Sequence, residues 1–134
     1  MSPREIVDEM MKGDAFSQWL GVDILETSKG SCKLKCRVRN EMLNGHQIAH
    51  GGITYSLSDS ALAFAANAHG MKCVSIETSI SHVNPVFVED LLRVESTEVY
   101  RGKTIGIYSV SIYNQENKIV SRFKGTVHIS EKSW

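Results

Sequence analysis

The sequence predicts an α+β fold in which one antiparallel, curled sheet wraps around a single long helix. Several short runs alternate apolar and polar residues, which is typical of half-buried strands. One segment, about residues 52–67, is rich in Ala, Leu and Ser and is apolar on nearly every side past Ser60. Strand-like runs lie on both sides of that segment, so a sheet built from them can enclose the helix.

The first twenty residues are predicted to be helical. Pro3 suits an early helical position with Ser2 as the cap, and Gly13 is a candidate break. Apolar side chains recur there at near-helical spacing, namely Ile6, Met10, Phe16 and Leu20.

Residues 21–39 predict a hairpin that turns at Ser28-Lys29-Gly30. Its second arm alternates Cys32, Leu34, Cys36 and Val38 with Lys or Arg. We therefore expect one buried face and one wet face on this strand.

The central segment, about Gly52 to Asn67, predicts a helix roughly 24 Å long at 1.5 Å per residue. His69-Gly70 supplies its C-terminal stop. The rest of the chain predicts about four strands in a meander. The turn and strand-end signals there are Asn84-Pro85, Arg101-Gly102-Lys103 and Asn114 to Asn117.

Length and composition indicate one domain over residues 1–134 and no partner of extreme charge. The 15 basic residues balance 15 acidic ones, so no global field attracts nucleic acid or an anionic membrane. The apolar run Ala61 to Ala68 is far shorter than the roughly 20 residues that span a bilayer. The acidic N-terminal residues argue against a signal or transit peptide.

The cysteines point to a reducing compartment. Their number is three, which is odd, and none lies in a zinc-like His/Cys cluster. We interpret Cys32 and Cys36 as packing thiols and expect the protein in the cytoplasm.

Asp59 is the first candidate for chemistry, because it lies on an otherwise apolar stripe of the predicted helix. An unpaired buried carboxylate is costly, so such a group needs partners or a function. The pattern also fits an Asp satisfied by neighbouring serines or placed at a solvent-exposed helix edge.

The stretch NGHQIAHGG, residues 44–52, supplies the second candidate. Gly51 and Gly52 fall where the helix should begin, so free N–H groups and the positive end of the helix dipole converge there. This is a candidate oxyanion site, although a tight turn into the helix also explains a double Gly. Taken singly, the Asn44-Gly45 dipeptide fits an ordinary turn. His46 and His50, each taken singly, fit ordinary hydrogen-bonding residues of a loop.

Gly51 and Asp59 are too far apart to act together within one chain. Eight helical positions correspond to about 12 Å, whereas both groups would need to lie within a few ångström of one carbonyl. If both act on one substrate, they come from different chains, which predicts a homodimer with sites at its interface.

At these residues the chain resembles the hotdog-fold thioesterases, and closely the phenylacetate-degradation thioesterase family. The resemblance spans about Phe16 to Val127 and is densest in NGHQIAHGGITYSLSDSALAFAANAHG. The asparagine, the HGG and the later aspartate form a joint pattern that is specific, whereas HGG alone would be weak.

The resemblance implies a role for each matching residue. Asp59 would be the nucleophile or the general base for water, and the family leaves both open. The Gly51 N–H would polarise the thioester carbonyl, with His50 holding the loop. Asn44 of the partner would position the water or the carbonyl, and Ser75 resembles a position that hydrogen-bonds the attacking water.

The resemblance also implies the substrate and the assembly. The family hydrolyses acyl-CoA thioesters without cofactor or metal, and it usually assembles as a dimer of dimers. This subgroup favours phenylacetyl-CoA and ring-hydroxylated aryl acyl groups, and Asp59 in place of a Glu fits the phenylacetyl side.

Basic residues are expected to frame the site mouth, because coenzyme A carries phosphates. Arg101 and Lys103 are the first candidates, and Lys72 and Arg93 are others. Each is also explained as a solvated surface charge.

Two alternative functions are open at this point. The chain could be a non-catalytic acyl-CoA sensor, which would not need Asp59; no helix-turn-helix accompanies it. It could also be a hydroxyacyl thioester dehydratase that uses His50 and Asp59, although the HGG-then-Asp order fits the thioesterases better.

Overall fold

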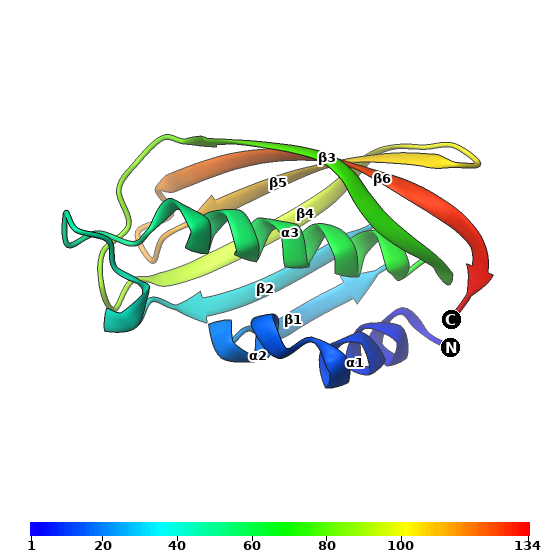
Figure 1. Ribbon diagram of the computed structural model, residues 1–134, viewed down its shortest axis with the longest axis horizontal. Coiled ribbons are helices and arrows are strands. Elements are labelled where there is room, and N and C mark those ends of the chain that lie inside the picture. Colours follow the sequence, from blue (N-terminus) through cyan, green and yellow to red (C-terminus); the bar gives the residue numbers. More distant parts are fainter.

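The computed structural model describes residues 1–134 as one six-stranded antiparallel sheet curled around a central helix (Figure 1). The elements are α1 (Pro3–Gly13), α2 (Ala15–Leu20), β1 (Asp23–Ser28), β2 (Ser31–Arg37), the 3-10 turn η1 (Asn40–Met42), α3 (Gly51–Asn67), β3 (Met71–His82), β4 (Leu91–Arg101), β5 (Ile105–Tyr113) and β6 (Ile119–Ser133). The strand order is β1-β2-β4-β5-β6-β3. The α+β prediction is confirmed.

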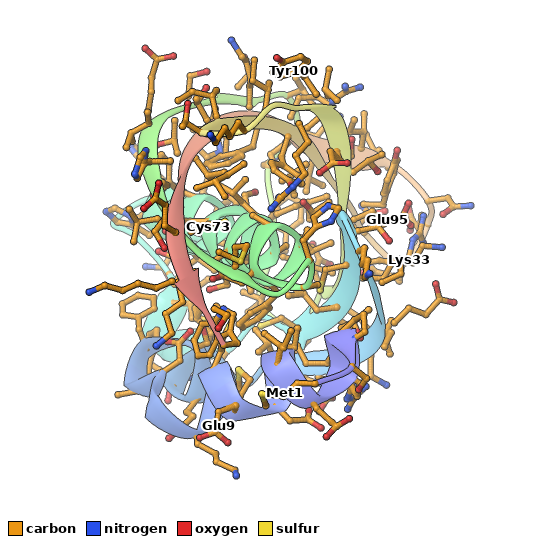
Figure 2. The ribbon with its side chains drawn as sticks, turned by 90° about the vertical axis from the view of Figure 1, so that its right-hand side faces the viewer. Met1, Glu9, Lys33, Cys73, Glu95 and Tyr100 are labelled. Carbon is orange, nitrogen blue, oxygen red and sulfur yellow. The ribbon has the colours of Figure 1, made fainter.

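The N-terminal helical segment consists of two helices that break after Gly13, as predicted. Ser2 caps α1, since its Oγ accepts the N–H of Glu5 at 3.1 Å. Asp14 ends α1 and caps α2 by accepting the N–H of Ser17 at 2.9 Å. Both helices cover the open side of the curled sheet, below α3 in Figure 2.

Helix α3 forms the centre of the core, as predicted, and begins one residue earlier than expected, at Gly51. Leu57, Ala61, Leu62 and Phe64 are completely buried. Such a helix can be apolar nearly all round because the sheet encloses it. No helix of this structure, α3 included, is both long and apolar enough to cross a membrane.

Strand β2 has the predicted buried and wet faces. Cys32, Leu34 and Cys36 are buried, whereas Lys33 and Arg37 are exposed. Burial raises the pKa of Cys32 to about 12 and that of Cys36 to about 11. Both thiols are unpaired and lie in the main hydrophobic core, so their interpretation as packing thiols is confirmed.

The predicted four-strand meander is wrong for one strand. Strands β4, β5 and β6 form a meander, but β3 pairs with β6 at the edge of the sheet, from Met71↔Ser133 to His82↔Ser121. Local patterning predicts a strand but not its neighbour, and consecutive strands are only the usual partners. Here residues 83–90 carry the chain away from β3, and β6 returns to pair with it.

A glycine of β6, Gly125, leaves no space for a larger side chain between the sheet and α3. A Cβ atom at Gly125 would lie 2.6 Å from Cδ2 of Leu62, which is completely buried and cannot swing into solvent. We expect Gly125→Ala to lower the free energy of unfolding by about 1–3 kcal/mol, measured by urea denaturation.

The control for this prediction is Gly13→Ala, where a Cβ atom would meet nothing within 4 Å. That change should stay within about 0.5 kcal/mol of the wild type. A Gly125→Ala protein as stable as the Gly13→Ala protein would show that Leu62 relaxes freely.

Candidate active site

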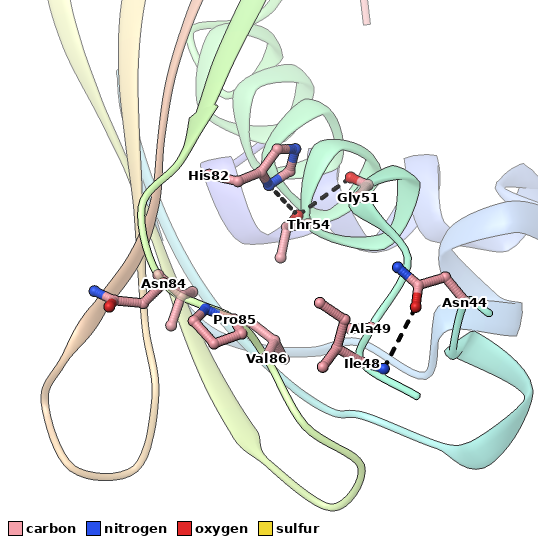
Figure 3. A pocket seen from close by; sticks show the side chains of 10 residues that line it. Asn44, Ile48, Ala49, Gly51, Thr54, His82, Asn84, Pro85 and Val86 are labelled. Carbon is pink, nitrogen blue, oxygen red and sulfur yellow. Dashed lines mark hydrogen bonds between the residues drawn. The ribbon is translucent and has the colours of Figure 1, made fainter. Parts of the chain in front are cut away.

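The first half of the candidate site is a pocket of about 210 Å³ at the start of α3 (Figure 3). The helix start, the loop before it and the end of β3 enclose it. Its lining residues are Asn44, Ile48, Ala49, Gly51, Thr54, His82, Asn84, Pro85, Val86 and Val120. The structure thus brings two of the predicted site residues, Asn44 and Gly51, to one cavity.

Gly51 offers a free backbone donor to this pocket. His50 is the N-cap of α3, and its Nδ1 accepts the N–H of Gly52 at 2.9 Å. The N–H of Ile53 donates to the His50 carbonyl oxygen at 2.9 Å. No acceptor of the chain satisfies the N–H of Gly51, which lies at the positive end of the helix dipole. The N–H of Gly52 is therefore used by the helix cap, whereas the N–H of Gly51 is free to donate to a carbonyl oxygen.

Asn44 presents a donor to the same pocket. Its Oδ1 accepts the N–H groups of His46, at 2.8 Å, and of Ile48, at 3.4 Å. These bonds hold the loop and leave the Nδ2 amide group without a partner in the chain. The loop has one strained residue, Gln47, with φ 63°. The side-chain oxygen of Asn44 therefore positions the loop, and its amide nitrogen is free to meet a ligand.

Asp59 lies in a different pocket, of about 260 Å³, between α3 and the N-terminal helices. Phe16 and Ser56 line it as well. Burial raises the pKa of the Asp59 carboxyl, the side chain of Ser75 lowers it, and the Asp14 carboxylate raises it further. A half-buried carboxylate with a raised pKa is a better proton acceptor than a surface one.

Within one chain the two half-sites are separate, since Gly51 and Asp59 line different pockets. Ser75 on β3 belongs with Asp59, because its side chain is one of the groups that set the pKa of that carboxyl. The structure does not bring the Gly51 donor and the Asp59 acceptor together.

The basic candidates lie away from the Gly51 pocket. Nη1 of Arg101 faces the carbonyl oxygen of Ala66, at 3.5 Å, at the opposite end of α3. Lys103 is exposed in the turn after β4. Arg93 is paired with Glu95 at 2.6 Å.

Sequence reasoning missed two residues of the first pocket, Thr54 and His82. Nδ1 of His82 lies 3.2 Å from Oγ1 of Thr54, and that hydroxyl donates to the Gly51 carbonyl oxygen at 3.2 Å. The two residues are 28 positions apart, so no local pattern links them. The one available signal was a histidine two residues before the strand-ending Asn84-Pro85.

Comparison with known proteins connects these half-sites to a family. Residues 46–121, which include Gly51, Asp59, Ser75 and His82, match the model of the thioesterase superfamily. The chain belongs to the thioesterase superfamily. The protein is accordingly a thioesterase, and the resemblance stated from the sequence is confirmed.

Two solved structures and one relative place this thioesterase more closely. It is 37% identical to the acyl-coenzyme A thioesterase PaaI of Escherichia coli over 89% of this chain and 85% of that protein. The structure of E. coli PaaI, from the phenylacetic acid degradation operon, superposes with a TM-score of 0.95, at 34% identity over 98% of this chain and 95% of that one. A hypothetical thioesterase of Streptococcus pneumoniae, solved with coenzyme A, gives a TM-score of 0.88 at 25% identity, over 94% and 98%. The predicted hotdog fold is confirmed.

Proposed function

We propose that this thioesterase hydrolyses acyl-CoA thioesters to free acid and CoA, with a preference for phenylacetyl-CoA or ring-hydroxylated aryl-acyl-CoA. The free N–H of Gly51 beside the Asn44 amide carries the proposal, because these donors suit a thioester carbonyl oxygen. The name and operon of the E. coli relative support the acyl-CoA class and the phenylacetyl group. The coenzyme A in the S. pneumoniae protein supports it too.

In the proposed mechanism the carbonyl oxygen accepts hydrogen bonds from the Gly51 N–H and from Nδ2 of the same chain's Asn44. Asp59 of the partner then attacks the carbonyl carbon, CoA leaves as thiolate, and water hydrolyses the resulting mixed anhydride. Alternatively Asp59 removes a proton from a water that attacks directly. In both routes the side chain of Ser75, which lowers the pKa of the Asp59 carboxyl, would hold the acid or its water in place.

A homodimer through β3 would join the half-sites. Strand β3 is a long edge strand, hydrogen-bonded only to β6, and it exposes 65% of Val74 and 57% of Ile76. Long, apolar edge strands readily pair with another chain. Ser75 of the acid half-site and His82 of the carbonyl half-site lie on this strand. Antiparallel pairing about a two-fold axis between Thr78 and Ser79 would place Ser75 opposite the partner's His82.

The proposal also covers assembly, cofactor and compartment. We propose a dimer of dimers that needs no metal or cofactor, because a carboxylate, water and backbone donors suffice for the chemistry. We propose a cytoplasmic location, which the three free thiols fit. Lys103, which forms no ion pair within the chain, is a candidate to meet the CoA phosphates.

The test is hydrolysis of a panel of CoA thioesters by the purified protein, followed as release of free thiol. Phenylacetyl-CoA and its ring-hydroxylated form should exceed benzoyl-CoA and fatty acyl-CoA in kcat/KM by about tenfold or more. A preference for fatty acyl groups would contradict the aryl assignment alone. Tight binding of every ester without turnover would instead indicate a sensor.

A further inference from the structure

We propose that His82 is a further substrate-contacting residue, whose Nε2–H donates a hydrogen bond to the thioester carbonyl oxygen beside the Gly51 N–H. This inference rests on the proposed function, because it takes the Asn44 and Gly51 pocket to hold the carbonyl group. It assigns a role to a side chain that lies 31 positions beyond Gly51 in the sequence and reaches the same cavity.

The fold places the His82 ring against the first turn of α3. His82 is the last residue of β3, and Nδ1 lies 3.2 Å from the Thr54 hydroxyl oxygen. Nε2 lies 3.1 Å from the point that a Cβ atom of Gly51 would occupy. Figure 3 shows one ring nitrogen bonded to Thr54 and the ring lying next to Gly51. The absent side chain of Gly51 thus lets the His82 ring lie directly against the Gly51 backbone, and both residues line the same pocket.

Counting hydrogens assigns the ring nitrogens. The hydroxyl of Thr54 has one hydrogen, which it donates to the Gly51 carbonyl oxygen, as helical threonines commonly do. Its oxygen must then accept from His82, so Nδ1 carries a proton. The remaining proton of an imidazolium sits on Nε2, where it can be gained or lost without disturbing Thr54. Buried Thr54, only 3% exposed, fixes the ring orientation.

The surroundings of His82 contain no competing charge in the pocket. Of its 10 lining residues His82 alone is titratable. From β6 it faces Ser121, and the neighbouring Arg122 donates to Ser109 at 3.3 Å. The preceding loop carries His46 and His50, which do not line the pocket, and Asp59 lies in the other one. A negative charge developing on a bound carbonyl oxygen is therefore the group best placed to favour an Nε2 proton.

A second donor at this oxygen supplies stabilisation that grows as the tetrahedral intermediate forms. Removing one donor from such a site typically lowers kcat by about 10²-fold or more. Loss of the Nε2–H donor is therefore expected to lower kcat for phenylacetyl-CoA.

The test compares His82→Gln with His82→Asn, because the two amides reach different ring positions. The glutamine amide can occupy the place of Nε2 and keep a donor there, whereas the asparagine amide reaches only the place of Nδ1. We expect His82→Asn to lower kcat by about 10²-fold. We expect His82→Gln to retain most activity, because its amide keeps a donor at the place of Nε2. His128→Gln, a change at an exposed histidine of β6, serves as the control.

Equal losses in the two variants would overturn the inference, since packing alone would then explain the effect. Wild-type rates in both variants would overturn it as well. Thermal unfolding midpoints, read alongside, identify any variant that has lost its fold. Absence of all thioester hydrolysis in the wild type would count against the proposed function itself, which keeps the two failures distinct.

Discussion

Asp59→Asn is expected to lower kcat for phenylacetyl-CoA by about 10²- to 10⁴-fold, the range associated with loss of a positioned base. Asparagine has nearly the same shape but can neither attack a carbonyl carbon nor remove a proton from water. The half-buried position of Asp59 and the raised pKa of its carboxyl make this group the strongest candidate for the acid. Initial rates of thiol release measure the effect.

The matched control is Asp8→Asn, which changes an exposed carboxylate paired with Arg4 on α1. Its kcat should equal that of the wild type, because surface ion pairs contribute little. A correctly folded Asp59→Asn protein with the rate of the Asp8→Asn control would exclude both proposed routes.

The raised pKa of Asp59 fixes the sign of its effect on stability. A carboxyl whose pKa is higher in the folded protein than in the unfolded chain stabilises the fold fully only below the unfolded value. This contribution is lost as the pH rises through the folded pKa. Above its folded pKa the ionised Asp59 therefore costs folding free energy, and there Asp59→Asn should unfold at a higher temperature than the wild type while hydrolysing less.

The sequence predicted the elements of the fold because each has a local cause. Cys32, Leu34 and Cys36 alternate with basic residues and become a half-buried strand, and Gly13 with Asp14 marks the break between α1 and α2. Such local patterns do not predict where β3 lies in the sheet. Its pairing with β6 joins residues as far apart as Met71 and Ser133, and it depends on how the whole sheet closes around α3.

The candidate site likewise contains residues that local patterns predict and residues that they do not. Asn44 and Gly51 were predicted because turn residues and a double glycine precede a helix, and both line one pocket. His82 was missed because only the curl of β3 over α3 brings it to Thr54. Sequence patterns therefore revealed groups held by one turn of chain, and not those joined by tertiary packing.

Mixing two inactive variants is expected to restore activity if each site combines both subunits. Asn44→Asp keeps the side-chain oxygen that accepts from His46 and Ile48 but removes the Nδ2 donor. Asp59→Ala removes the acid and leaves the carbonyl half-site intact. A hybrid dimer of the two has one site with both changes and one site with neither.

The expected recovery follows from the two-fold symmetry of the dimer. Random exchange of equal amounts makes half of the dimers hybrids, each with one of two sites intact, so the mixture should reach about one quarter of the wild-type rate. If each variant carries a different affinity tag, purification through both tags isolates the hybrids. Each variant refolded alone provides the background.

Verified hybrids that hydrolyse no faster than this background would contradict sites shared between subunits. The two half-sites of one chain would then have to approach each other by a rearrangement of α3. That outcome conflicts with the helix itself, because Gly51 and Asp59 are fixed about 12 Å apart along its axis and face separate pockets. Complementation between chains is the result that requires no rearrangement of α3.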